Sequence, residues 1–78
     1  MIEVRFFAAA REAAGTSGAR IAADSVGELR TQLVKVFGAR MEQVLMVSSL
    51  VSDGRRLSDD DPVADGTEID VLPPFAGG

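Results

Sequence analysis

The last six residues of the sequence have types and an order that could carry chemistry. They read PPFAGG, from Pro73 to Gly78. Prolines lack a backbone donor and favour an extended course, and Ala76, Gly77 and Gly78 carry almost no side chain. We predict an arm that threads into a tunnel of another protein, with Phe75 as its anchor in a partner pocket. A Gly-Gly end alone is typical of a frayed terminus, but the stiff proline pair favours the working arm.

The chemistry open to this arm is acyl chemistry at the carboxylate of Gly78. An α-carboxyl group is ionised at pH 7 and is a poor electrophile. Adenylation with ATP converts one of its oxygens into a leaving group, and a sulfur donor that displaces AMP leaves a thiocarboxylate. The carrier needs no catalytic side chain for this, because other proteins perform the catalysis.

The composition excludes most alternatives. The 78 residues include no Cys and no His, which removes disulfides, thiolate and Ser-His nucleophiles and imidazole metal ligands. The net charge of −4 disfavours nonspecific binding to nucleic acid or an anionic membrane. No apolar run approaches the roughly 20 residues that cross a bilayer, and the N-terminus does not read as a signal peptide. We therefore expect a cytoplasmic chain that is not an enzyme by itself.

Two further groups of residues could suggest a functional site, but neither has the pattern that such a site requires. Asp59, Asp60 and Asp61 are consecutive, whereas a calcium loop needs acidic ligands at alternating positions. We expect a solvated turn before Pro62 and no metal site. Lys35 falls beside the apolar stripe of a predicted helix, where a solvated lysine is ordinary.

The elements that must position the arm begin with a predicted strand over residues 2–7. Alternation places Ile2, Val4 and Phe6 on one face and Phe7 on the other. An alanine-rich helix is predicted over residues 8–14, and a second strand over residues 19–23.

The long helix has the clearest pattern, over residues 26–37. Ser25 and Glu28 have the spacing of a capping box, in which Glu28 reaches back to the amide of Ser25. Apolar residues then recur at helical spacing, and Gly38 suits the left-handed position after the last turn.

The remaining segments predict three short strands. Residues 44–50 form a nearly unbroken apolar run, typical of a buried strand. A short strand follows the turn at Asp53-Gly54, and residues 68–72 alternate until the proline pair ends the ladder. The first and last strands can lie side by side as parallel neighbours, with the central helix as the crossover.

The predicted fold is therefore α+β, a β-grasp with a mixed sheet of about five strands and one main helix packed across it. Residues 1–74 form this domain and residues 75–78 form the tail.

Both ends of the sequence resemble those of the MoaD/ThiS-type sulfur carriers. The first motif is Phe6-Phe7-Ala8 with Arg11-Glu12 and Gly15; the second is Asp65-Gly66-x-Glu68, an apolar strand and the Pro-Pro-Phe-Ala-Gly-Gly end. The sequence is most similar to the small subunit of molybdopterin synthase, over nearly its whole length.

The resemblance implies a ubiquitin-like fold and a set of partners. An E1-like adenylyltransferase would adenylate Gly78 with ATP, and a sulfurtransferase would supply the sulfur. The thiocarboxylated tail would then enter the synthase large subunit and donate sulfur to cyclic pyranopterin monophosphate, with no cofactor bound stably to the carrier. By similarity, Phe7, Arg11, Leu72 and Phe75 would contact these partners.

Several alternatives stay open at this point. The same acyl chemistry serves carriers for thiamin thiazole or cysteine biosynthesis, and the fold also serves ubiquitin-like modifiers and interaction modules. For Phe7 and Leu72, ordinary packing or isolated exposure is an equal alternative to a contact role.

Overall fold

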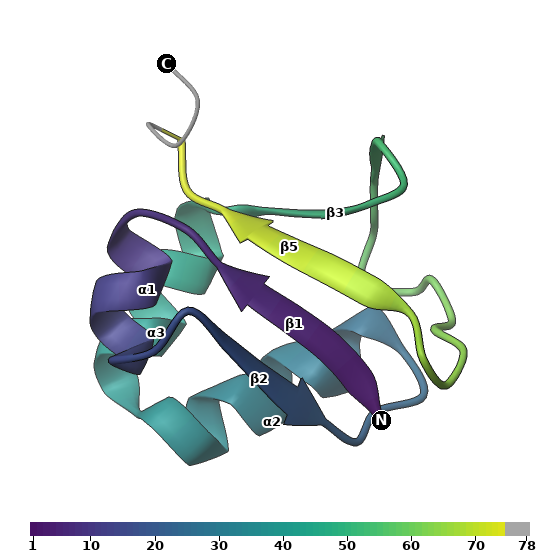
Figure 1. The fold of residues 1–78 in the computed structure, drawn as a ribbon, viewed down its shortest axis with the longest axis horizontal. Helices are drawn as coiled ribbons and strands as arrows, with labels where there is room; N and C mark the ends of the chain where they lie inside the picture. The colour runs from purple at the N-terminus through teal and green to yellow at the C-terminus, as the bar shows by residue number, and fades with distance from the viewer. Residues whose placement is uncertain (75–78) are drawn as a thin grey trace.

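Within residues 1–74, which the computed structural model describes, five strands form one mixed sheet and the helices cover one of its faces (Figure 1). The elements in chain order are β1 (Ile2–Phe6), α1 (Ala9–Ala14), β2 (Gly18–Ile21), α2 (Val26–Phe37), α3 (Ala39–Val47), β3 (Ser49–Ser52), β4 (Arg55–Arg56) and β5 (Glu68–Leu72). The other face of the sheet is open. None of these helices is long and apolar enough to cross a membrane.

The centre of the sheet is made by the first and last strands. The strand order is β2-β1-β5-β3-β4, and only β1 and β5 run parallel. Val4 lies opposite Ile69, and Phe6 lies opposite Val71. The predicted parallel pairing and the β-grasp fold class are confirmed, and the chain between the two strands supplies the crossover that a parallel pair requires.

The core lies between the sheet and the helices. The alternate residues Ile2, Val4 and Phe6 of β1 are buried, as the period of two predicts, and Ile69 and Val71 of β5 are fully buried. The ring of Phe6 meets that of Phe37 edge to face, with 5.3 Å between centroids. Burial of these side chains is the main stabilising contribution.

Helix α2 has the predicted bounds, and its first turn is capped nearly as predicted. The hydroxyl of Ser25 accepts a hydrogen bond from the amide of Glu28 at 3.1 Å. The carboxylate of Glu28 accepts from the amide of Asp24 instead of that of Ser25. Gly38 has φ +92° and ψ −168°, a conformation that favours glycine but is not left-handed helical, so this detail of the prediction is wrong.

The predicted strand over residues 44–50 is wrong in its first half. Residues 39–47 form helix α3, and strand β3 begins only at Ser49. Met41 and Leu45 are buried and Val44 packs beside them, which is helical spacing. The main helix is therefore joined by a second one, and the short second strand is also shifted, to Gly18–Ile21.

The acidic loop is a turn in which Asp59 and Asp60 are exposed, as predicted, and its backbone also caps α2, which the sequence pattern did not indicate. The carbonyls of Asp59 and Asp61 accept hydrogen bonds from the amides of Gly27 and Val26, both at 3.0 Å. These are amides of the first turn, which have no partner inside the helix. A Cβ atom on Gly27 would lie 3.3 Å from the Asp59 carbonyl, so the close approach favours glycine.

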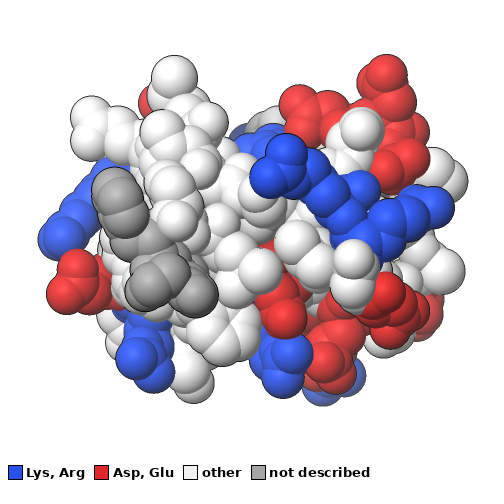
Figure 2. All heavy atoms as spheres, turned by 90° about the horizontal axis from the view of Figure 1, so that it is seen from above, with Lys and Arg blue, Asp and Glu red and all other residues white. Residues whose placement is uncertain are grey.

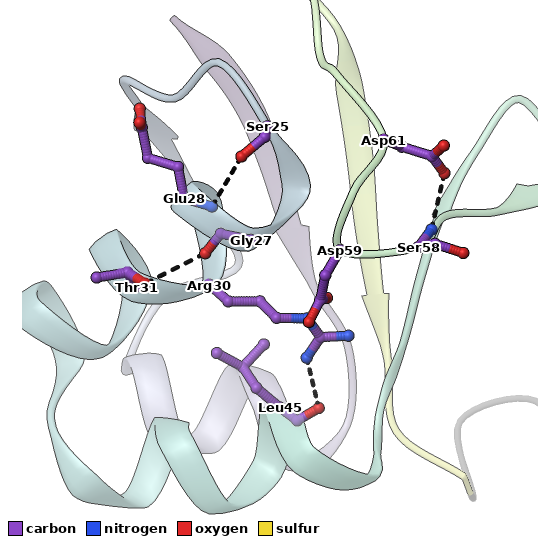
Figure 3. A network of polar contacts seen from close by, with 9 residues as sticks. All are labelled: Ser25, Gly27, Glu28, Arg30, Thr31, Leu45, Ser58, Asp59 and Asp61. Atoms are coloured by element: carbon purple, nitrogen blue, oxygen red, sulfur yellow. Dashed lines mark hydrogen bonds and ion pairs between the residues drawn. The ribbon is translucent and has the colours of Figure 1, made fainter.

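Arg30 joins this loop to both long helices (Figure 3). Its Nε donates to the Asp59 carboxylate at 2.7 Å, and its Nη1 donates to the Leu45 carbonyl at 2.9 Å. The Leu45 carbonyl is in the last turn of α3, where it also accepts a hydrogen bond from the amide of Ser48 at 3.2 Å. One guanidinium therefore stabilises the start of one helix and the end of the other.

We expect Arg30→Ala to lower the free energy of unfolding by about 1–3 kcal/mol, because it leaves a partly buried carbonyl without its charged donor. Arg20→Ala is the matched control, since Arg20 also pairs through Nε at 2.7 Å, with Glu3, but is well exposed. The control should cost less than about 0.5 kcal/mol. Urea unfolding followed by circular dichroism measures both, and equal losses would contradict the role given to Arg30.

Candidate functional site

The predicted arm starts at the end of the central strand. Phe75, Ala76, Gly77 and Gly78 lie outside the described residues. The structure does describe their point of departure: Pro73 is buried and Pro74 is exposed, directly after β5. In Figure 1, β5 is the yellow strand, and it ends where the described chain also ends. We call this end of the sheet, where the carboxyl ends of β1 and β5 lie together, the edge. The base of the arm is therefore fixed by the centre of the sheet.

The parallel pairing brings two predicted contact residues to this edge. Because Phe6 lies opposite Val71, Phe7 and Leu72 are the next residues of adjacent strands at their carboxyl ends. The side chain of Phe7 is 36% exposed and that of Leu72 is half-buried. Neither belongs to the buried core, so both can offer apolar surface to a partner.

Arg11 stands apart from these two. It lies on the short helix α1, which begins two residues after Phe7, and it is exposed. No carboxylate within residues 1–74 forms an ion pair with it. Its guanidinium is available to a partner, and its predicted contact role remains a prediction.

Ion pairs occupy the open face of the sheet beside this edge. Arg5 donates two hydrogen bonds to the Asp70 carboxylate, at 2.7 and 3.0 Å, and lies 3.6 Å from Glu68. The hydrogen bond to Asp70 raises the pKa of Arg5, and the charge of Asp70 adds to that effect. The Arg5 guanidinium also lies 5.8 Å from the centroid of the Phe7 ring, within cation–π range. The ion pairs therefore hold Arg5 where it supports the exposed aromatic ring.

The sequence pattern missed two exposed apolar residues close to this edge. Met46 and Val47, at the end of α3, are 79% and 63% exposed. Ser49 follows them and pairs with Leu72, which brings the end of α3 to the edge where β5 ends. The signal was the helical spacing of Met41, Val44 and Leu45, which leaves Met46 and Val47 facing outward.

The surface at this end of the molecule carries few charges (Figure 2). Uncharged atoms gather around the place where the described chain ends, and the largest group of acidic and basic side chains lies at the other side of the same view. Depletion of charge at the centre is typical of protein interfaces. No group of three acidic side chains within residues 1–74 could hold a metal ion. The arrangement suits docking to a partner.

Comparisons with known proteins agree with this picture. A family model described as the ThiS family matches residues 4–78. None of the curated proteins matches the chain. SAMP1 from Haloferax volcanii has 25% identity and a TM-score of 0.83, covering 99% of this chain and 98% of its own.

Two molybdopterin-converting factors are also similar. A chain in the complex of subunits 1 and 2 from Helicobacter pylori 26695 has 28% identity and a TM-score of 0.74, covering 99% of this chain and 97% of its own. A putative subunit 1 from Pyrococcus furiosus has 24% identity and a TM-score of 0.77, with coverage of 95% and 97%, which shows the fold alone.

The two neighbouring phenylalanines should separate stability from recognition. Phe6→Ala removes a buried ring and should cost about 3–5 kcal/mol of unfolding free energy. Phe7→Ala removes an exposed ring and should cost about 1 kcal/mol or less. Thermal and urea unfolding of both variants tests this, and a Phe7→Ala loss as large as that of Phe6→Ala would place Phe7 in the core instead of on a docking edge.

Proposed function

The chain belongs to the ThiS family of ubiquitin-like sulfur carriers, and on this premise we propose that it is the sulfur-carrying small subunit of a molybdopterin synthase. Its body is a non-catalytic carrier domain, and Gly78 is the group that is loaded. The observation that carries the proposal is the order of parts at the end of the chain: a central strand, a proline pair and four residues that finish in Gly-Gly.

The proposed loading of Gly78 with sulfur proceeds in two steps, adenylation and then displacement of AMP. A carboxylate oxygen of Gly78 attacks the α-phosphorus of ATP, and pyrophosphate leaves. A hydrosulfide equivalent then attacks the carbonyl carbon, so that a carbon–sulfur bond forms, the bond to the AMP oxygen breaks and AMP leaves. An E1-like enzyme supplies the first site and a sulfurtransferase supplies the sulfur. The thiocarboxylate is then the sulfur donor to cyclic pyranopterin monophosphate in the large subunit.

The folded body contributes recognition in this proposal. Leu72 and Phe7 offer an apolar edge at the base of the arm, and Arg11 offers a cation that has no carboxylate partner within residues 1–74. A partner that covers this edge places the arm at the mouth of its own tunnel. Phe75 would anchor in a pocket of the partner, and Ala76 and Gly77 would thread through the tunnel. Binding and chemistry are thus divided between the edge of the sheet and the arm.

Two observations bear on the choice of pathway. The chain with 28% identity comes from a complex of the two subunits of molybdopterin-converting factor, which supports a large-subunit partner. SAMP1 is a small archaeal modifier protein, which favours a second candidate, conjugation of Gly78 to lysines of other proteins. Carriers for thiamin thiazole or cysteine biosynthesis share the acyl chemistry. The candidates differ in what is transferred and to what. Each sulfur carrier gives sulfur to the substrate of its own pathway, and a modifier gives its acyl group to a lysine.

Intact-mass measurement tests the loading. Incubation with ATP, an E1-like adenylyltransferase and a sulfide source should raise the mass by the difference between one sulfur and one oxygen, located at Gly78. Deletion of Gly78 should abolish the gain without changing the unfolding free energy, because the hydrophobic core that stabilises the domain lies within residues 1–74. Loading of the deletion variant would contradict the proposal. Isopeptide conjugates in cells, without any thiocarboxylate, would favour the modifier.

Binding to a molybdopterin synthase large subunit tests the docking edge. Leu72→Asp should weaken binding roughly tenfold or more, because it puts a charge in the centre of the contact. Val36→Asp is the matched control, an exposed apolar residue on α2, away from the edge. Isothermal titration calorimetry measures both. Equal effects of the two substitutions, or no binding by the unchanged chain, would overturn the assigned interface.

A further inference from the structure

A groove runs between α2 and α3 on the helical side of the molecule. It encloses about 330 Å³, and its lining includes Arg30, Val34, Lys35, Glu42, Leu45 and Met46. The α2 residues lie one turn apart on one helix face, and the α3 residues have the same relation. Phe7 and Leu72 do not line the groove, although Met46 at its end lies close to the edge where β5 ends, and the proposed function does not use the groove.

The shape of the groove is fixed before anything binds. Arg30 is at its wall, and its guanidinium is held by the Asp59 carboxylate on one side and the Leu45 carbonyl on the other (Figure 3). These bonds tie the two helices together beside the groove. A preformed site loses little conformational freedom on binding.

An apolar projection stands at the rim of this apolar groove. Met46 is 79% exposed, whereas Leu45 beside it is buried and Val34 is half-buried. A single exposed apolar residue is ordinary on a protein surface. Here the exposed methionine lies beside an apolar groove, which is less ordinary. A methionine side chain adapts well to an irregular apolar space, so Met46 suits a groove of the same kind on another molecule.

Two opposite charges flank the same groove. Lys35 comes from α2 and Glu42 from α3, and both are exposed. Neither side chain forms an ion pair with any group in residues 1–74. By contrast, most charged residues on the open face of the sheet and in the acidic loop do form ion pairs. The groove therefore carries one free cation on one wall and one free anion on the other.

We propose that a second copy of this chain occupies the groove, in a dimer with a two-fold axis. In such an isologous contact a surface meets itself, so its features must be complementary in pairs. The two-fold places Met46 of each copy in the groove of the other and sets Lys35 of each copy against Glu42 of the other. Met46 with the groove, and Lys35 with Glu42, are two complementary pairs of this kind. The two-fold axis forms each pair twice.

The dimer should be weak. The patch is small and each copy carries a net charge of −4, so the two local ion pairs form against a general repulsion. Small interfaces of this kind give transient association, with a dissociation constant on the order of 100 µM.

Sedimentation velocity of the full chain over a concentration series up to about 1 mM tests the proposal. Met46→Asp, Lys35→Glu and Glu42→Lys should each weaken the dimer roughly tenfold or more. The double variant Lys35→Glu/Glu42→Lys should recover the association, because it restores both pairs with their signs exchanged. Val36→Asp, another exposed apolar position on α2, should leave it unchanged.

Glu42→Lys separates this contact from general charge effects. It reduces the net charge from −4 to −2, since one anion becomes a cation, and general repulsion alone would then predict tighter association. The proposal predicts weaker association.

A monomer at every concentration would overturn the proposal, and so would a dimer insensitive to these substitutions. Circular dichroism checks that each variant is folded. Amide NMR shifts of the unchanged chain on dilution give a second measurement, expected to change along α2 and α3, and changes confined to the sheet would also overturn the assignment.

Discussion

The parallel pairing of β1 with β5 is the constraint on which the rest of the structure depends. It places the two ends of the described chain in the middle of the sheet, with Val4 opposite Ile69 and Phe6 opposite Val71. Every other element is then part of one crossover that must leave this pair and return to it. The same pairing fixes the direction in which the chain leaves the domain. The position of Pro73 and Pro74, where the described chain ends, is therefore set by the core and not by a surface loop.

The polar groups of the domain are arranged so that none of them needs the interior. No charged or polar residue within residues 1–74 is buried, and the guanidinium of Arg5 is matched to carboxylates on the open face. The core of the described residues therefore carries no destabilising buried charge. Under the proposed function, the surface needs apolar area that a partner can cover, and Phe7 and Leu72 offer it outside the buried core.

Much of the fold could be predicted because several local signals agreed. The capping box and apolar stripe gave α2 its bounds, and the alternation in the first and last strands gave their buried faces. Helix α3 was missed because a short apolar run suits a buried strand as well as a helix, and only burial of Met41 and Leu45 together decides between them. The cap formed by Asp59 and Asp61 depends on contacts distant in sequence, which no local pattern contains. Phe7 and Leu72 lie outside the buried core and their contact role stays a prediction, while the tail residues lie outside the described chain.

The shortness of β4 has a consequence for how other chains can approach the sheet. It forms one border of the sheet and consists of two residues, both arginine. Sheets grow, in fibrils or by capture of a foreign strand, when a border offers a long row of free amides and carbonyls with little charge. Two residues give almost no such row, and two like charges repel a second copy of the same border. This border of the sheet is thereby protected against strand-by-strand polymerisation.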